Sequence, residues 1–251
     1  MARVLCVANQ KGGVGKTTTA VNLAASLAAA ERRVLLVDVD PQSNASSGVG
    51  VRLEPGEVST YDVLLGRAPL AEAVRPTQVP HLSVVPSAPD LAGAEVELVA
   101  RPRRELRLRS ALQAVRDEYD FVFLDCPPSL GLLTVNALVA SDGVIIPLQC
   151  EYYALEGLSQ LLRTVRAVRR SFNPRLDIEG IVLTMFDTRN NLSHQVADEV
   201  RRHFRSRVFR SVIPRNVRLS EAPSHGKPAL LYDIRSAGAQ SYLRMAREIL
   251  G

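Results

Sequence analysis

The stretch Lys11-Gly12-Gly13-Val14-Gly15-Lys16-Thr17-Thr18 decides the fold of this 251-residue chain. It follows Val4–Ala8, a short apolar run that predicts a buried strand, and it opens Lys16–Ala30, where apolar residues recur at helical spacing. A glycine-rich turn between a strand and a helix points several backbone N–H groups into one concavity, and the helix N-terminus adds positive potential. The stretch is therefore predicted to bind phosphate groups.

Each part of this loop has a predicted task. The three glycines, Gly12, Gly13 and Gly15, permit the backbone path and the close approach of phosphate oxygens. Lys16 is predicted to reach the β- and γ-phosphates of ATP, and the Thr17 hydroxyl to ligate Mg²⁺. The pattern GxxxxGK[ST] is incomplete, because Gln10 stands at the first glycine position and Lys11 appears inside the loop. A glycine-rich turn with incidental lysines is the alternative interpretation.

Acidic residues follow two later apolar runs. Val34–Val37 leads into Asp38-Val39-Asp40-Pro41-Gln42, and Phe121–Leu124 leads into Asp125-Cys126-Pro127-Pro128. Because ligands bind at the carboxyl ends of the strands in an open parallel sheet, these carboxylates are expected beside the phosphate loop. Asp125 is predicted to hold Mg²⁺ through a water or to orient Thr17, and Asp40 to orient the attacking water. A capping or turn role is the alternative for each aspartate.

The alternation of apolar runs and helical patterns continues along the chain. Further strands are predicted at Leu82–Val85, Val144–Leu148, Ile178–Thr184 and Val208–Ile213, and helices at Arg104–Arg116, Leu130–Val139, Leu155–Arg170, Ser193–Phe204 and Ala237–Leu250. This order predicts a doubly wound α/β fold, with a mostly parallel sheet covered by helices on both faces. No linker divides the chain, so residues 1–251 are expected to form a single domain. Val51–Pro80 is the least regular part and resembles an insertion.

Composition narrows the class of protein. The formal net charge is +5, and nearly all basic residues are arginine, because the three lysines are Lys11, Lys16 and Lys227. The three cysteines lack CxxC spacing and the four histidines are scattered, which favours reduced thiols over disulfides or a zinc site. No signal peptide or membrane-spanning run is recognisable, so a cytoplasmic protein with no membrane partner is expected.

Together these motifs resemble the deviant Walker ATPases, a group that includes ParA, MinD and the nitrogenase iron protein. Two further stretches, Gln149–Gly157 and Val212–Gly226, favour the chromosomal ParA family. The resemblance implies an ATPase with ATP and Mg²⁺ as cofactors, in which the whole loop from Lys11 to Thr18 contacts the nucleotide. It implies catalytic roles for Lys11, Lys16 and Asp40, with Lys11 reaching across a homodimer interface to the partner's nucleotide. It also implies that Pro214, Arg215 and Asn216 hold the adenine base.

One small departure from the family is Ser43, where glycine is frequent. We expect this serine to leave the mechanism intact.

A second charged feature concerns DNA. Arg201–Arg218 contains seven arginines and no acidic residue. Guanidinium contacts to phosphates give salt-sensitive affinity that does not depend on base sequence. The resemblance implies non-specific binding of double-stranded DNA by the ATP dimer, a ParB-type activator, nucleoid association, and a role in chromosome or plasmid segregation. Arg189 and Arg218 are the predicted DNA contacts, with a solvated surface position as the alternative for any single arginine.

The sequence leaves three alternative functions open. A membrane-cycling ATPase like MinD requires a membrane-targeting C-terminal helix, and Tyr242–Leu250 lacks a lysine-rich face and aromatic anchors. An electron-transfer protein like the nitrogenase iron protein requires cluster cysteines, and the surroundings of Cys126 and Cys150 do not match that family. A small-molecule kinase on the same fold would turn over ATP only with an added acceptor.

Overall fold

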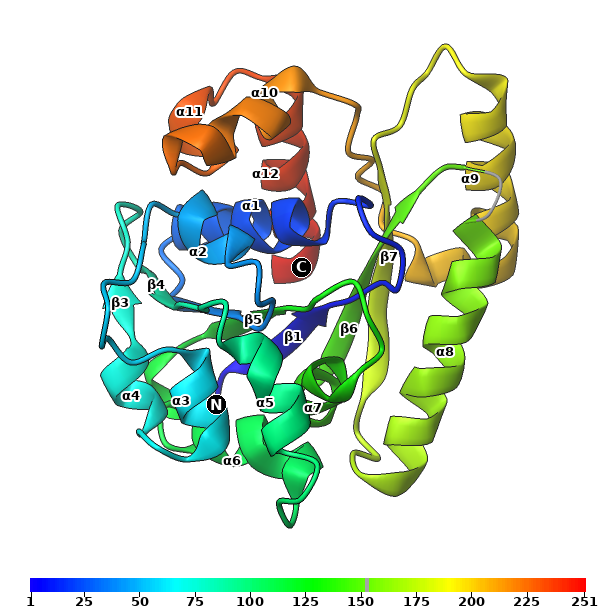
Figure 1. The fold of residues 1–251 in the computed structure, drawn as a ribbon. Helices are drawn as coiled ribbons and strands as arrows, with labels where there is room; N and C mark the ends of the chain where they lie inside the picture. Colours follow the sequence, from blue (N-terminus) through cyan, green and yellow to red (C-terminus); the bar gives the residue numbers. More distant parts are fainter. Residues whose placement is uncertain (152–153) are drawn as a thin grey trace.

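The sheet of the computed structural model carries the architecture (Figure 1). The structure describes residues 1–151 and 154–251, so Tyr152 and Tyr153 of the stretch Gln149–Gly157 lie outside the described residues. Within the described ranges seven strands form one sheet in the order β3-β4-β2-β5-β1-β6-β7. They are β1 (Arg3–Val7), β2 (Val34–Asp38), β3 (Arg75–Pro76), β4 (Leu82–Val85), β5 (Phe121–Asp125), β6 (Gly143–Gln149) and β7 (Asp177–Thr184).

All neighbouring strands pair in parallel except the edge pair β3 and β4, which is antiparallel. The larger helices are α1 (Lys16–Ala28), α7 (Leu132–Ala140), α8 (Ala154–Ser171), α9 (Asn191–Phe204) and α12 (Ala237–Leu250). Shorter ones are α2 (Asn44–Gly48), α3 (Thr60–Leu65), α4 (Leu70–Ala73), α5 (Leu91–Glu97), α6 (Arg107–Gln113), α10 (Val217–Glu221) and α11 (Ala229–Tyr232). The predicted doubly wound fold is confirmed.

Alternation along the central strand produces two hydrophobic cores. Val4 and Cys6 of β1 face the core shared with α7 and α8, whereas Leu5 and Val7 face the core shared with α1 and α12. Because both faces are buried, β2 and β5 are apolar apart from their terminal aspartates. The sheet therefore delivers the ends of β1, β2 and β5 to one edge, with the phosphate loop directly after β1.

The predicted strand Val208–Ile213 is wrong. The segment runs beside β7, but only isolated bridges form at its two ends, Ile181 to Val208 and Phe186 to Pro214. Between them the amides of Arg210 and Ser211 donate to the Glu248 carboxylate of α12, at 2.8 and 2.7 Å. A side chain from a distant helix therefore takes the donors that a strand ladder would use.

Two further expectations were inaccurate. The segment Val51–Pro80 is not an irregular insertion, because it forms α3, α4 and the edge strand β3. The predicted helix Arg104–Arg116 is divided into a 3₁₀ turn (η1, Arg104–Leu106), α6 and a region that ends in a second 3₁₀ turn (η2, Arg116–Glu118).

A close approach of two glycines joins the loop after α2 to the C-terminal part of the chain. Gly50 has φ +82°, and a Cβ added there would lie 2.8 Å from the Gly226 carbonyl oxygen. Gly226 follows η4 (Ala222–His225) and is itself left-handed, at φ +62°. Neither position tolerates a side chain without a backbone shift.

We predict that Gly50→Ala lowers the free energy of unfolding by about 2–4 kcal/mol, because it adds a backbone clash to the strain of a left-handed alanine. Gly56→Ala is the matched control, since Gly56 also has a positive φ of +89° but a Cβ there meets nothing within 4 Å. The control should lose about 1 kcal/mol. Urea unfolding followed by circular dichroism measures both, and equal losses would show that the glycine contact is not tight.

Candidate active site

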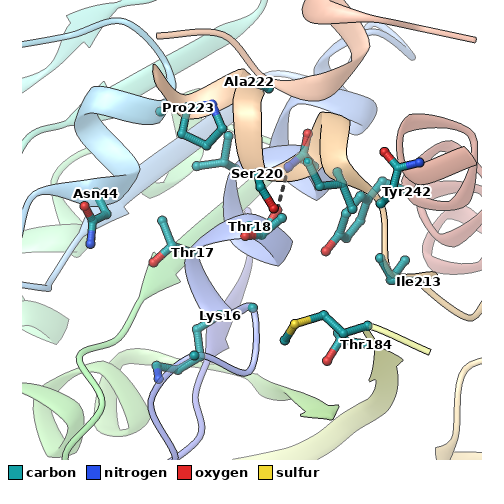
Figure 2. A pocket seen from close by; sticks show the side chains of 18 of the residues that line it. Lys16, Thr17, Thr18, Asn44, Thr184, Ile213, Ser220, Ala222, Pro223 and Tyr242 are labelled. Atoms are coloured by element: carbon teal, nitrogen blue, oxygen red, sulfur yellow. Dashed lines mark hydrogen bonds between the residues drawn. The ribbon is translucent and has the colours of Figure 1, made fainter. Parts of the chain in front are cut away.

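A cavity of about 700 Å³ opens at the carboxyl ends of the strands (Figure 2). Its walls come from the phosphate loop and the first turns of α1, from the loop after β2, and from the segment between β7 and α10. Figure 2 shows Lys16 and Thr17 on the phosphate-loop side, with Ser220 and Pro223 across from them and Tyr242 nearby. Residues distant in sequence thus meet around one site.

Contacts with β6 and β7 fix the conformation of the phosphate loop. Gly13 and Gly15 adopt left-handed conformations, at φ +73° and +86°, and Gly15 is the N-cap of α1. The Thr184 hydroxyl at the end of β7 donates to the Val14 carbonyl at 2.8 Å. The Asn9 amide donates to the Pro147 carbonyl of β6 at 2.7 Å. Two strands therefore anchor the loop backbone at both ends.

Lys16 lies inside this loop with only 7% of its surface exposed. Its Nζ donates to the Lys11 carbonyl oxygen at 3.0 Å. Burial lowers the pKa of Lys16, and the nearby Asp125, Cys126 and Asp40 oppose that shift. An anionic phosphate placed in the loop would favour the charged ammonium and supply stronger acceptors than one carbonyl.

The carboxyl groups of Asp38 and Asp125 are fully buried, and Asp125 lies near Lys16. They end β2 and β5 at paired register positions. Burial is the main cause that raises the pKa of Asp125 well above its usual range, and the charge of Asp38 adds to it. Burial likewise raises the pKa of Asp38 to about 6, although hydrogen bonds from Ser46 oppose the shift.

The two aspartates differ in their partners. Asp38 accepts hydrogen bonds from Ser46 N at 2.8 Å, Ser46 Oγ at 2.6 Å and Asp40 N at 3.1 Å. Both Asp125 oxygens are buried without a hydrogen-bond partner in the described residues. The Thr17 hydroxyl is close enough to lower the pKa of Asp125, yet it does not meet the geometry of a hydrogen bond.

This arrangement fits Mg²⁺. A buried carboxylate without a donor is unfavourable unless a cation or proton joins it. Within the described residues no group of three or more His, Cys, Asp or Glu side chains forms a ready metal cage. Mg²⁺ commonly uses one or two protein ligands and completes its shell with phosphate oxygens and water. Thr17 and Asp125 are the side chains in position to hold it.

Asp40 lies in the loop between β2 and α2 with 6% of its surface exposed. Its Oδ1 accepts a hydrogen bond from Gln42 N at 2.9 Å, and it lines the cavity. Ser43, at φ +56°, is the N-cap of α2 in the left-handed region that glycine favours. The strained serine thus sits in the short loop that carries Asp40.

Lys11 is placed at the outer side of the loop. Its ammonium pairs with the Glu151 carboxylate, and the two side chains are 39% and 47% exposed. Its backbone N–H donates to Asn9 Oδ1 at 3.0 Å. The ammonium therefore points toward Glu151, two residues beyond the end of β6.

The segment predicted to hold the base reaches the cavity. Pro214, Arg215 and Asn216 all line it, and Arg215 N donates to the Phe186 carbonyl at 3.1 Å. Asn216 caps α10, since its Oδ1 accepts from Arg218 N at 3.1 Å. The structure brings this segment and the phosphate loop together around one cavity.

The sequence did not predict that residues near the C-terminus line the cavity. Tyr242 of α12 lines the cavity and shares a 3.1 Å hydrogen bond with the Thr19 hydroxyl of α1. Asn22 of α1 accepts a hydrogen bond from Ala229 N at 2.7 Å and donates to the Thr18 carbonyl at 2.8 Å. The contacts of Tyr242 with Thr19 and of Ala229 with Asn22 join residues more than 200 positions apart, so no local pattern signals them.

The predicted DNA contacts, Arg189 and Arg218, lie beside the segment of Pro214, Arg215 and Asn216. Arg189, 86% exposed, pairs through two nitrogens with Asp187 at 3.0 Å, and that pairing is the main cause that lowers the pKa of Asp187 to about 2. Arg218 pairs with Glu221 at 2.8 Å and with Asp233 at 3.5 Å. Both arginines thus have internal carboxylate partners.

A parallel sheet, a glycine-rich loop capping α1 and acidic residues ending two adjacent strands define a P-loop nucleotide-binding protein. Residues 2–178 match the family described as AAA domain. The chain is 59% identical to the chromosome partitioning protein ParA of Myxococcus xanthus, over 100% of this chain and 88% of that protein. It is 58% identical to the sporulation initiation inhibitor protein Soj of Bacillus subtilis, over 99% and 98% of the two chains. The chain belongs to the ParA/Soj family of chromosome-partitioning ATPases.

Solved structures share the fold of this chain. A Mycobacterium smegmatis protein named cobyrinic acid a,c-diamide synthase, solved with ADP and magnesium, is 40% identical with a TM-score of 0.87, over 100% of this chain and 94% of that one. The septum site-determining protein MinD of Pyrococcus horikoshii, solved with Mg-ADP, is 27% identical with a TM-score of 0.80, over 99% and 96%. Among the described residues, none of the helices is able to span a membrane.

The buried charge of Asp125 gives a stability prediction. Without nucleotide and Mg²⁺, Asp125→Asn should raise the free energy of unfolding at pH 8 by about 1–3 kcal/mol, because it removes an unpartnered buried charge. The raised pKa of Asp125 means that the folded wild type gains a proton as pH falls, so the wild type recovers stability and the difference from the variant shrinks. Urea unfolding at several pH values measures this, and a difference that grew on acidification would contradict it.

Proposed function

We propose that this chain is a Mg²⁺-dependent ATPase that segregates DNA by alternating between an ATP-bound dimer and a released monomer. The observation that carries the proposal is that Lys16 and Thr17 line one cavity while Asp125 is buried close to both, without a hydrogen-bond partner in the described residues, in a chain of the ParA/Soj family. Relatives solved with ADP, an ATP analogue and magnesium support the choice of ligands.

ATP binding is proposed to exchange partners within the loop. The Lys16 ammonium leaves the Lys11 carbonyl and binds the β- and γ-phosphates, while backbone N–H groups of the loop donate to phosphate oxygens. Mg²⁺, held by Thr17 and Asp125, would neutralise phosphate charge. Pro214, Arg215 and Asn216 are proposed to hold the base, because they form the wall of the cavity next to α1.

Hydrolysis is proposed to depend on Asp40. It is buried, it faces the cavity, and its backbone N–H is fixed by Asp38. From this position its carboxylate orients the attacking water. Phosphate release then removes the ligand that holds the loop and Lys16 in the bound arrangement.

Dimer formation is proposed to use Lys11. Its ammonium is partly exposed and pairs with an exposed carboxylate, an interaction worth little in water. A second protomer's phosphates offer more negative charge than Glu151, so Lys11 would leave Glu151 and bind them. Two nucleotides would then be enclosed between two protomers.

The dimer is proposed to bind double-stranded DNA of any sequence through Arg189 and Arg218, and a ParB-type protein is proposed to speed hydrolysis. Joining two basic surfaces in one rigid body raises the effective concentration of the second, so avidity rises by about 10²-fold or more. Hydrolysis separates the surfaces and releases the DNA. The cycle would place the protein on the nucleoid and move chromosomal or plasmid cargo.

A DNA-binding measurement tests this function. Fluorescence anisotropy on a duplex of arbitrary sequence should show binding with a non-hydrolysable ATP analogue, weak binding with ADP, and loss of binding as salt rises. Arg189→Glu with Arg218→Glu should abolish binding. Arg33→Glu with Arg67→Glu is the matched control, because these arginines are similarly paired with carboxylates elsewhere. Equal affinity with ATP analogue and ADP would exclude the nucleotide switch.

A second test concerns Lys11. Lys11→Ala should bind the ATP analogue as a monomer, whereas Glu151→Gln, which frees the ammonium without removing it, should dimerise at least as well as wild type. Light scattering with the analogue gives the mass of each species, and isothermal titration gives nucleotide affinity. A normal dimer of Lys11→Ala would remove the proposed role of this lysine across the interface.

A further inference from the structure

Helix α8 presents a row of arginines that the nucleotide site does not use. Residues 157–176 contain five arginines and no acidic residue. One side of the helix, with Leu158, Leu161, Val165 and Val168, is buried against the core. Arg163, Arg166 and Arg170 are exposed, and their i, i+3, i+7 spacing places them in one row along the opposite side.

These three side chains have no carboxylate partner among the residues that the structure describes. None of them belongs to an ion pair within the part of the chain that the structure describes; Arg166 donates only to the Leu162 carbonyl of its own helix, at 3.2 Å. On neighbouring α9, by contrast, Arg201 pairs with Asp198 and Arg202 with Glu199. The row on α8 therefore retains its full charge toward solvent.

The chemistry of the row favours a phosphate backbone. Among the described side chains of the helix, the exposed positions around the row are small or polar, such as Ser159 and Ala167, and the next large exposed apolar residue in the sequence is Phe172, just beyond the end of the helix. Protein partners generally require an apolar centre at the interface, which this face lacks. A line of guanidinium groups without an apolar centre matches instead the regular anionic charges of nucleic acid.

The position of α8 relates this row to the DNA contacts proposed above. β7 is the edge strand of the sheet, and α8 and α9 lie along this same edge of the molecule (Figure 1). Asp177, at the start of β7, pairs with Arg169 of α8 at 3.6 Å and with Arg207 at 3.0 Å. Arg207 belongs to the 3₁₀ turn after α9, which also contains Arg205. Arg189 immediately precedes α9 at its other end. Basic residues thus follow one edge from Arg189 to α8.

We propose that Arg163, Arg166 and Arg170 form a second row of phosphate contacts for the same duplex that Arg189 and Arg218 bind. The inference rests on the proposed DNA-binding function and extends its footprint along the β7 edge. Each phosphate contact contributes about 0.9 to the slope of log Kobs against log salt concentration. Three contacts therefore add about 2.7 for every protomer whose row engages the duplex.

The test uses the full chain, a non-hydrolysable ATP analogue and a random duplex, with anisotropy measured over a range of salt concentrations. The variant Arg163→Gln, Arg166→Gln, Arg170→Gln should lose at least about tenfold in affinity, and its salt slope should be shallower by about 2.7 or more. The matched control is Arg32→Gln, Arg101→Gln, Arg103→Gln, because these arginines are also exposed and have the same charge. The control should keep the wild-type slope. Light scattering with the analogue and thermal unfolding verify that both variants still dimerise and fold.

The outcomes separate the two proposals. Wild-type affinity and slope in the α8 variant, together with loss of binding in the Arg189 and Arg218 variant, would overturn the second row and leave the proposed function standing. Equal losses in the α8 variant and its control would assign the effect to net charge and also overturn it. If the wild type binds no DNA with the analogue, the proposed function and the row fail together. If the α8 variant binds DNA like wild type but no longer responds to an acidic protein that changes DNA binding of the wild type, α8 would be assigned to a protein partner instead.

Discussion

Asp125 and Asp38 end adjacent parallel strands at paired positions, and both carboxyl groups are fully buried. Strand order imposes this proximity, since β2 and β5 are neighbours and β1, which leads into the phosphate loop, is the next strand. Like charges buried together are unfavourable. Lys16 lies close to Asp125, and Ser46 and the Asp40 amide donate hydrogen bonds to Asp38. Both Asp125 oxygens have no hydrogen-bond donor within the described residues. The site therefore gains most from a cation that arrives with the ligand.

The same constraint places strain in the short connection after β2. The chain must turn so that Asp40 faces the cavity and Ser46 reaches Asp38. It does so with Ser43 in a left-handed conformation and with the Ser43 hydroxyl buried without a hydrogen-bond partner among the residues that the structure describes. Left-handed serine costs free energy that glycine would not. The hydrogen bonds to Asp38 hold this turn in place. Ser46 Oγ also accepts a hydrogen bond from Ser87 N at 3.1 Å, so the turn is connected to Ser87, two residues beyond the end of β4. A movement of Asp40 on hydrolysis would therefore be transmitted to this region.

Local sequence patterns predicted the elements that alternate regularly. The phosphate loop, the aspartates that end β2 and β5, and the large helices follow from apolar periodicity and from glycines, which act over a few residues. The strand predicted at Val208–Ile213 failed because Glu248, nearly forty residues away, binds two of its amides. The contacts of Tyr242 with Thr19 and of Asn22 with Ala229 were missed for the same reason, since they depend on how α12 and α11 pack on α1. Ser43 was recognised as a departure, but its backbone angle alone explains why glycine suits that position.

Four cations of the proposed cycle each have an internal partner in this structure. Lys16 binds a loop carbonyl, Lys11 binds Glu151, Arg189 binds Asp187, and Arg218 binds Glu221 and Asp233. In the proposed cycle each would exchange an internal partner for a phosphate, so the net free-energy gain per contact would be the difference between two interactions and would be correspondingly small. Small differences suit a protein whose ligands must leave again after hydrolysis. Arg163, Arg166 and Arg170 have no such partners within the described residues, so their contribution to DNA affinity would be present in every nucleotide state. It would raise the retention of each protomer on DNA, while the exchanging cations near the nucleotide determine when the stronger, dimeric attachment forms and ends.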